Sequence, residues 1–331
     1  KQEIESGNTY QINYSFSQRA LYNVEPYTAF SSFTDQHSSP YAAFINTGLF
    51  KVASLSPELF FSLDGSQITC RPMKGTAARG KTALEDKYQI KRLLSSSKDQ
   101  AENLMIVDMI RNDLGRIAVP GSVSVDNLFT LETYETLFQM TTNVSARTDA
   151  SFSDIFYALF PRASISGATM IQTMRLINEL ETDARDIYTG SVGYFAPNRQ
   201  AQFNVAIRTL LINSHEKKLT YGTGSGVVWD SQAEKEFAEC QTKTKIVRKL
   251  AQSFDLLETM RWCPSDGFAL LDYHLIRLEK SATHFLFQFD RQAIRRELDS
   301  FTATLDATPK VIRLLLNKRG NIRIEAKQLV K

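Results

Sequence analysis

Two pairs of acidic residues have the spacing that places carboxylates on one face of a helix. Asp99 and Glu102 lie three residues apart in the segment KDQAENLMIVDMIRND. Glu236 and Glu239 repeat this spacing in SQAEKEFAE, and Lys243 follows Glu239 by one helical turn. Two such helices could hold a hard cation, because Mg²⁺ is commonly bound by a few carboxylates together with waters and substrate oxygens. Acidic residues on helix faces are more often simply solvated, so the spacing alone leaves both interpretations open.

A lysine occupies an unusual place in RPMKGTAARG, residues 71–80, directly after a strand-like segment. Lys74 stands between Pro-Met and Gly-Thr, with Arg71 and Arg79 on either side. A lysine that attacks a substrate must lose its proton near neutral pH, which burial or neighbouring cations favour. Lys74 is therefore a candidate nucleophile, and the alternative is an ordinary surface ammonium group in a solvated turn.

Two further features could bind an anion. The segment TYGTGSGVV places Gly222, Gly224 and Gly226 between a strand and the next helix, where a glycine loop lets backbone N–H groups approach a ligand. A hairpin or bulge without a ligand would explain the same residues. Arg208 lies in the apolar strand VAIRTLL, where a charged side chain needs a partner. That partner could be a substrate carboxylate bound by both branches of the guanidinium, or an internal Asp or Glu.

Composition and missing motifs exclude several classes of function. The net charge is +3 and basic residues are interspersed with acidic ones, so the chain lacks the basic stripe of a nucleic-acid-binding protein. No apolar run reaches membrane-spanning length, and the three cysteines show neither disulfide nor metal spacing. The four histidines have no ligand spacing, and no Gly-x-Ser-x-Gly or HExxH motif is present. We therefore expect a cytoplasmic protein that binds neither nucleic acid nor membrane.

Hydrophobic periodicity predicts an α+β fold. Strand patterns, rich in aromatic and β-branched residues, occupy residues 10–17, 50–63, 187–195, 201–212 and 218–228. Helical spacing runs through about 85–117 and 167–181, and a third helix is predicted to start at Ser231 with the capping-box sequence SQAE. Helices and strands do not alternate regularly, which favours α+β over a doubly wound sheet.

A break near residues 248–254 divides the chain into residues 1–250 and 251–331. The second part begins a new pattern, with the strand FDLLETMRW, the amphipathic helix DYHLIRLEKSATHFL and the strand KVIRLLL. At 331 residues the chain exceeds what one core usually supports, which also predicts two domains. The second part has few elements for its length, and the chain does not begin with Met. We therefore expect it to be a fragment of a longer protein.

A series of motifs resembles the chorismate-binding enzymes, the family of anthranilate synthase component I, aminodeoxychorismate synthase component I, isochorismate synthase and salicylate synthase. In the family's order, residues 1–250 contain GNTYQINYS, SPELFF, RPMKGTAARG, AENLMIVDMIRNDLGRI, FPRASISGA, YTGSVGYF, VAIRT and GTGSGVVWDSQAEKEFAE. So many ordered matches are specific, whereas any one alone would be weak. The resemblance implies layered antiparallel sheets with peripheral helices. It also implies that the carboxylates, the glycines and Arg208 share one pocket.

The resemblance further implies roles for individual residues. Mg²⁺ would be bound chiefly through Glu102, Glu236 and Glu239, with Asp99 where relatives often have Glu, and it would hold the ring carboxylate of chorismate. Glu58 of SPELF matches the family's general acid, which protonates the departing C4 hydroxyl because hydroxide alone is a poor leaving group. Substrate contacts are implied at Gln11, Thr76, Ser164, Tyr188, Arg208, Gly224, Gly226 and Lys243.

Two positions select a branch of this family. Members that add water carry a lysine base where this chain has Gln11, so isochorismate and salicylate synthesis are disfavoured. Anthranilate synthases resemble Pro-Ile-Ala-Gly-Thr where this chain reads PMKGT, residues 72–76. A lysine there is typical of the aminodeoxychorismate synthases, whose lysine attacks C2 of chorismate before ammonia enters at C4. No amidotransferase cysteine motif is visible, so ammonia would come from a separate glutaminase subunit. Anthranilate synthesis is the alternative within the family.

Two segments depart from the family's pattern. The expected Gly-Ser-x-x-Gly-Ala-Pro-Lys reads ASISGATM, so Thr169 and Met170 replace the Pro and the Lys. Gln139 stands where many relatives have an active-site histidine. These departures motivate a hypothesis from another class, a non-catalytic protein that binds chorismate.

Residues 251–331 have a resemblance of their own. FDLLETMRW and LLDYHLIRLEKSA resemble the start of the class IV aminotransferase-type, pyridoxal-phosphate-dependent aminodeoxychorismate lyases. Arg277 matches an arginine that contacts the cofactor phosphate there. The family's Schiff-base lysine would lie beyond residue 331, so we do not expect this fragment to hold pyridoxal phosphate. A synthase joined to the lyase that consumes its product points to 4-aminobenzoate and folate synthesis.

Overall fold

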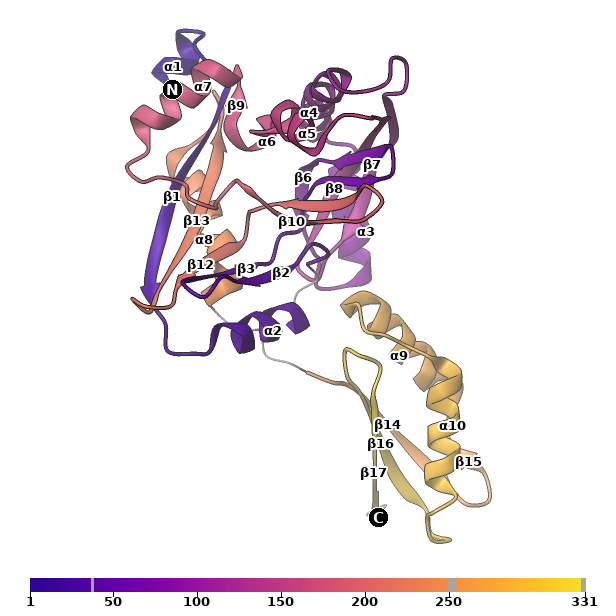
Figure 1. Ribbon diagram of the computed structural model, residues 1–331. Coiled ribbons are helices and arrows are strands. Elements are labelled where there is room, and N and C mark those ends of the chain that lie inside the picture. Colours follow the sequence, from indigo (N-terminus) through magenta and orange to yellow (C-terminus); the bar gives the residue numbers. More distant parts are fainter. Residues whose placement is uncertain (37–38, 249–253, 329–331) are drawn as a thin grey trace. The chain divides into compact units, whose positions relative to one another are not determined.

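The computed structural model describes residues 1–36, 39–248 and 254–328, and it divides the chain into two compact units (Figure 1). The first unit comprises residues 1–79 and 88–250, and the second comprises residues 80–87 and 251–331. No helix within the described ranges combines the length and the apolar character needed to cross a membrane.

The described part of the first unit contains two antiparallel sheets (Figure 1). The six-stranded sheet has the order β2-β3-β12-β13-β1-β9 and consists of β1 (Gln11–Leu21), β2 (Ala43–Asn46), β3 (Phe50–Ser54), β9 (Gly167–Ala168), β12 (Thr209–Asn213) and β13 (Lys218–Val227). The seven-stranded sheet has the order β10-β11-β4-β5-β8-β6, with β7 paired to β8, and consists of β4 (Leu59–Asp64), β5 (Gln67–Arg71), β6 (Met73–Ala78), β7 (Ser124–Thr133), β8 (Leu137–Arg147), β10 (Ser191–Ala196) and β11 (Gln200–Val205).

Two short links carry the chain between these sheets, one from β3 to β4 and one from β11 to β12. The links lie side by side, because the Leu55 N–H donates to the Arg208 carbonyl at 3.0 Å and the Val205 N–H donates to the Glu58 carbonyl at 3.0 Å. Residues far apart in the sequence, Glu58 and Arg208 among them, are thereby brought to the junction of the two sheets.

Helices surround the sheets. Between residues 1 and 248 the described helices are α1 (Gln2–Glu5), α2 (Pro26–Gln36), α3 (Ala83–Leu94), α4 (Ser97–Gly115), α5 (Phe152–Leu159), α6 (Ala163–Ser166), α7 (Met170–Leu180) and α8 (Ala233–Arg248). Helix α4 buries Ile106, Ile110 and Leu114 in the core of the seven-stranded sheet, because these residues recur along one helical face. Ser96 caps α4 by accepting a hydrogen bond from the Asp99 N–H at 3.3 Å, which fixes where its acidic first turn begins.

Several predicted element boundaries are wrong. The helix predicted over 85–117 is two helices, α3 and α4, because Ser96 begins a new helix. The strand over 50–63 is interrupted by the link between β3 and β4, and the helix over 167–181 begins only at Met170. The helix predicted from Ser231 begins at Ala233, because the Ser231 hydroxyl accepts a hydrogen bond from the Val228 N–H at 3.0 Å and closes the preceding turn.

The glycine loop and the strand position of Arg208 are also corrected. Gly224 and Gly226 lie in β13, paired with Ser15 and Asn13 of β1, so the segment is a regular strand. The β1 backbone passes so close that a Cβ on Gly224 would lie 2.5 Å from a carbonyl oxygen of β1. Arg208 lies in the link between β11 and β12, with a φ of 50° in the left-handed region that non-glycine residues seldom adopt.

Residues 254–328 of the second unit form a four-stranded antiparallel sheet with two helices (Figure 1). Its strands follow the order β15-β14-β16-β17 and are β14 (Leu256–Cys263), β15 (Gly267–Phe268), β16 (Lys310–Leu316) and β17 (Ile322–Gln328). Helices α9 (Leu271–Phe285) and α10 (Arg291–Thr302) contribute Leu278 and Leu298 to its core, beside Ile312 of β16. The two strands and the helix predicted here are present as β14, β16 and α9. In β16 every second residue of KVIRLLL is buried, as expected for a strand with one face on the core.

Candidate active site

A cavity of about 580 Å³ opens at the junction of the two sheets in the first unit. Its wall is built from the β3–β4 link, β6, the start of α4, β8, the β11–β12 link, β13 and α8. A second cavity of about 370 Å³ shares Lys74, Glu102 and Glu239 with it, so the two belong to one site. The residues predicted from the sequence that line one or both are Gln11, Glu58, Lys74, Thr76, Asp99, Glu102, Tyr188, Arg208, Gly226, Glu236, Glu239 and Lys243.

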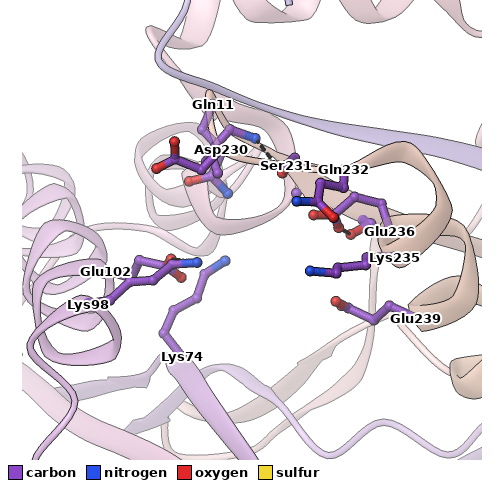
Figure 2. A pocket seen from close by; sticks show the side chains of 13 residues that line it. Gln11, Lys74, Lys98, Glu102, Asp230, Ser231, Gln232, Lys235, Glu236 and Glu239 are labelled. Atoms are coloured by element: carbon purple, nitrogen blue, oxygen red, sulfur yellow. Dashed lines mark hydrogen bonds and ion pairs between the residues drawn. The ribbon is translucent and has the colours of Figure 1, made fainter.

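Carboxylates from two helices face each other across the second cavity. Figure 2 shows Glu102 of α4 on one side and Glu236 and Glu239 of α8 on the other, and Lys74 projects into the space between them. The Glu236 carboxylate accepts a hydrogen bond from the Ser225 hydroxyl of β13. The two predicted helical pairs therefore do reach one site from opposite walls.

These carboxylates are partly paired with lysines. The Glu239 carboxylate lies 2.8 Å from the Lys243 ammonium, and the Glu102 carboxylate lies 3.9 Å from the Lys98 ammonium. Within the ranges that the structure describes, no three His, Cys, Asp or Glu side chains are close enough to hold a metal ion by themselves. The donor set is nevertheless all oxygen and anionic, which is the chemistry that Mg²⁺ requires, and substrate or water oxygens commonly complete its shell.

The backbone around Lys74 is irregular and held by side chains. Strand β6 shifts register against β8 between Met73 and Thr76, and Gly75 within this bulge has a φ of 91°. The Gln139 side chain fixes the bulge, since its amide nitrogen donates to the Gly75 carbonyl at 2.9 Å and its oxygen accepts from the Thr76 hydroxyl at 2.9 Å. Bulges redirect side chains at functional sites, and here the half-buried Lys74 side chain enters the site.

Glu58 is the most deeply buried carboxylate of the site. Its side chain is 8% exposed, and its Oε1 lies 3.3 Å from Nη1 of Arg162. Burial raises the pKa of Glu58, while the positive charges of Arg162 and Lys74 lower it. A carboxyl group that can carry a proton therefore lines the same cavity as Lys74.

Arg208 offers a positive charge to the cavity. Among the described residues its guanidinium makes neither an ion pair nor a hydrogen bond. Burial lowers the pKa of Arg208, and the nearby Tyr221 opposes this effect. Burial also raises the pKa of Tyr221 to about 12 and raises the pKa of Tyr188. Neutral phenols and an unpaired guanidinium are suited to binding an anionic ligand.

The remaining predicted residues are placed as follows. Gln11 and Gly226 line the second cavity. Gly224 lines neither cavity, and its carbonyl accepts a hydrogen bond from Lys243 Nζ at 2.9 Å. The Ser164 side chain lies outside the described part of the chain. Arg277 belongs to the second unit, where its Nε donates to Glu258 Oε1 at 2.8 Å.

Sequence reasoning missed four residues near the cavities: Tyr221, Arg162, Lys98 and Lys235. Tyr221 stands in the segment that drew attention only for its glycines, and its hydroxyl donates to the Lys243 carbonyl at 3.1 Å. Lys98 and Lys235 line the second cavity within the two acidic helices, and each could have been found from the same helical spacing. Arg162 gave no local signal, because its partner is 104 positions away in the sequence.

We expect the substitution Gly222→Ala to disturb the site through Tyr188. A Cβ on Gly222 would lie 2.1 Å from Tyr188 Cγ, so the ring must move, at a cost of about 1–3 kcal/mol in the free energy of unfolding. Gly115→Ala is the control, because a Cβ there meets nothing within 4 Å. Urea denaturation measures both. An equal effect of the two substitutions would contradict the close contact, and Tyr188→Ala should suppress the cost of Gly222→Ala.

Comparison with known proteins gives one consistent result. Residues 1–249 match the family described as chorismate binding enzyme. Aminodeoxychorismate synthase component 1 of Bacillus subtilis is 38% identical over 241 residues, which are 72% of this chain and 51% of that protein. Anthranilate synthase component 1 of Cereibacter sphaeroides is 35% identical over 259 residues, 77% of this chain and 51% of that protein.

A solved structure supports the same fold. The crystal structure of anthranilate synthase component I from Streptococcus pneumoniae TIGR4 has a TM-score of 0.69 and 30% identity, and the match covers 75% of this chain and 55% of that one. The predicted α+β fold of layered antiparallel sheets is thereby confirmed. The chain spans about half the length of the curated relatives it matches.

Proposed function

The chain belongs to the family of chorismate-binding enzymes, and from this premise we propose that its first unit aminates chorismate to 4-amino-4-deoxychorismate. The observation that carries the proposal is Lys74, whose side chain enters a site that also contains Glu58, Arg208 and the opposed carboxylates. The relatives named aminodeoxychorismate synthase component 1 support the same choice.

The first half of the proposed reaction forms a covalent adduct. The neutral Lys74 amine forms a bond to C2 of chorismate, the two conjugated ring double bonds shift by one position each, and the C4–O bond breaks. Glu58 gives a proton to the departing oxygen, so that water leaves, and the new ammonium group on Lys74 releases one proton. Glu58 is suited to this role because burial raises the pKa of its carboxyl group, so that it can hold a proton taken up during the reaction until the oxygen departs.

The second half releases the product. Ammonia forms a bond to C4, both ring double bonds shift back, and the bond between Lys74 and C2 breaks as the lysine nitrogen recovers a proton. The sum is chorismate plus ammonia giving 4-amino-4-deoxychorismate plus water. Splitting one substitution into two allylic steps lowers the barrier of each.

Substrate binding is assigned to the remaining residues of the site. Arg208 would bind a carboxylate of chorismate through both branches of its guanidinium, beside the neutral phenols of Tyr188 and Tyr221. Residues Gln11, Thr76, Gly224, Gly226, Lys243 and Ser164 are further proposed contacts. The bulge held by Gln139 presents Lys74 to the ring, which gives this glutamine a supporting role where relatives have histidine.

Magnesium is proposed to bind between α4 and α8. Glu102, Glu236 and Glu239, with Asp99 nearby on α4, would hold it. When bound, Mg²⁺ supplies positive charge for the ring carboxylate of chorismate. Lys98 beside Glu102 and Lys243 beside Glu239 compensate the negative charge of these carboxylates when Mg²⁺ is not bound.

Ammonia is proposed to come from glutamine through a partner. The relatives' name, component 1, implies a second component, and we propose that it is a glutaminase subunit. In the second unit, the resemblance to aminodeoxychorismate lyases leads to the proposal that the longer protein also consumes the product. Pyridoxal phosphate, with Arg277 at its phosphate, would then bind only to a complete lyase domain.

Two other functions have specific support. Anthranilate synthase component I is favoured by the relative from Cereibacter sphaeroides and by the Streptococcus pneumoniae structure. A non-catalytic chorismate-binding protein is favoured by Gln139, Thr169 and Met170, which depart from the family's motifs. Neither accounts for a lysine that projects between the carboxylates.

Incubation with chorismate, Mg²⁺ and ammonium, followed by identification of the product, tests the proposal. We expect 4-amino-4-deoxychorismate, and we expect its formation to stop when a chelator removes the metal. Anthranilate as the main product would identify the alternative enzyme. Calorimetric binding of chorismate without turnover, unchanged in Lys74→Ala, would identify the binding protein.

A further inference from the structure

Arg162 is a buried arginine directly behind Glu58. Its side chain is 3% exposed, and its Nη1 lies 3.3 Å from Glu58 Oε1 and 2.7 Å from the Leu59 carbonyl oxygen. The guanidinium carbon lies 5.6 Å from the centre of the Phe60 ring. The guanidinium is therefore fixed by a carboxylate, a carbonyl and an aromatic face from consecutive residues of one segment.

This arrangement is expensive as a purely structural device. Arg162 Nη2 is buried without a hydrogen-bond partner among the described residues, and such a group costs free energy. Buried ion pairs stabilise folds little, because desolvation offsets their attraction. Glu58 lines the larger cavity, whereas Arg162 does not. The ion pair therefore joins a carboxylate of the site to an arginine in the protein interior.

The ion pair occupies only one oxygen of Glu58. Oε1 faces Arg162, and Oε2 accepts no hydrogen bond from the described residues. We infer that Arg162 is a positioning residue for Glu58, which it holds by Oε1 and keeps ionised in the free enzyme, so that Oε2 can take a proton from Lys74 and pass it to the departing hydroxyl. This inference deepens the proposed function and rests on it for the identity of the substrate.

The charges around Glu58 support this role. Burial raises the pKa of Glu58, and the cations that oppose burial are Arg162 and Lys74. Arg162 also interacts electrostatically with Asp113 of α4 and with the Cys70 thiol of β5. Removing Arg162 leaves burial opposed by Lys74 alone, so the pKa of Glu58 must rise and the carboxyl group must stay protonated to a higher pH.

The test is a ¹³C NMR titration of the Glu58 carboxyl group, assigned by its loss in Glu58→Gln. In Arg162→Met we expect the pKa of Glu58 to rise by roughly one to three pH units. Arg199→Met is the matched control, because within the described part of the chain the half-buried Arg199 guanidinium bonds only to the carbonyls of Gly65, Thr148 and Ala150. It should leave the titration of Glu58 unchanged.

A folded Arg162→Met protein with an unshifted Glu58 would overturn the inference. If that variant does not fold, Arg162→Gln carries the test, because its amide can still donate a hydrogen bond to the Leu59 carbonyl but has no positive charge. An unshifted Glu58 in Arg162→Gln would then overturn the inference. The titration needs no turnover, so it stands even if the protein does not aminate chorismate. If the protein does aminate chorismate, the rising limb of the plot of kcat/KM against pH should move to higher pH in Arg162→Met.

Discussion

Replacement of Lys74 by alanine should abolish amination while leaving chorismate bound. Loss of a nucleophile that forms a covalent intermediate typically lowers kcat by roughly 10³-fold or more. Affinity should change far less, because the carboxylates of the substrate are assigned to Arg208 and to the two helices rather than to Lys74. Intact-mass spectrometry of the wild type with chorismate and Mg²⁺, without ammonia, should detect a chorismate-derived adduct that Lys74→Ala lacks.

Lys235→Ala is the matched control, since Lys235 lines the same cavity from α8 and has no assigned role. It should keep the adduct and most of the activity. An adduct that persists in Lys74→Ala, or an activity that falls equally in both variants, would show that the lysine acts only as a surface charge of the site. The proposed two-step mechanism would then be wrong.

Most residues of the site could be predicted from the sequence, because each lies in a short local motif. Glu58, Lys74 and Glu239 each belong to a short segment whose residue types suggest chemistry, and the structure brings all three to one site. The fold could be predicted from the order of these segments, and it is confirmed. Periodicity alone gave only approximate boundaries, since a single capping residue such as Ser96 can divide a helical pattern.

Features that depend on contacts between distant segments could not be predicted. The glycines near Gly224 looked like an anion-binding loop, but β1 pairs with them along its length and makes them a strand. Arg208 looked like a strand residue, but the passage of the chain between two sheets places it in a link. The pairing of Arg162 with Glu58 joins segments 104 positions apart, and no local pattern indicates it.

Arg208 is where binding and stability should oppose each other most clearly. Its backbone has a φ of 50°, its burial lowers its pKa, and no described acidic group pairs with it. An arginine held in this way is unfavourable in the free protein and becomes favourable when an anionic ligand arrives. The expense is therefore explained if the residue is maintained for binding, as is common where active sites trade stability for function.

Arg208→Met should accordingly weaken chorismate binding and stabilise the free protein. We expect the dissociation constant, measured by calorimetry, to increase by a factor between about 30 and more than 1000. This increase corresponds to a loss of about 2–5 kcal/mol in binding free energy. The free energy of unfolding in urea should rise by about 1–2 kcal/mol. Arg185→Met is the opposite case, because Arg185 pairs with Glu181 at 2.6 Å and donates to the Asn13 carbonyl at 2.7 Å, so that its loss should destabilise the fold. If Arg208→Met destabilises the free protein as Arg185→Met does, Arg208 is a structural residue and another cation must bind the carboxylate.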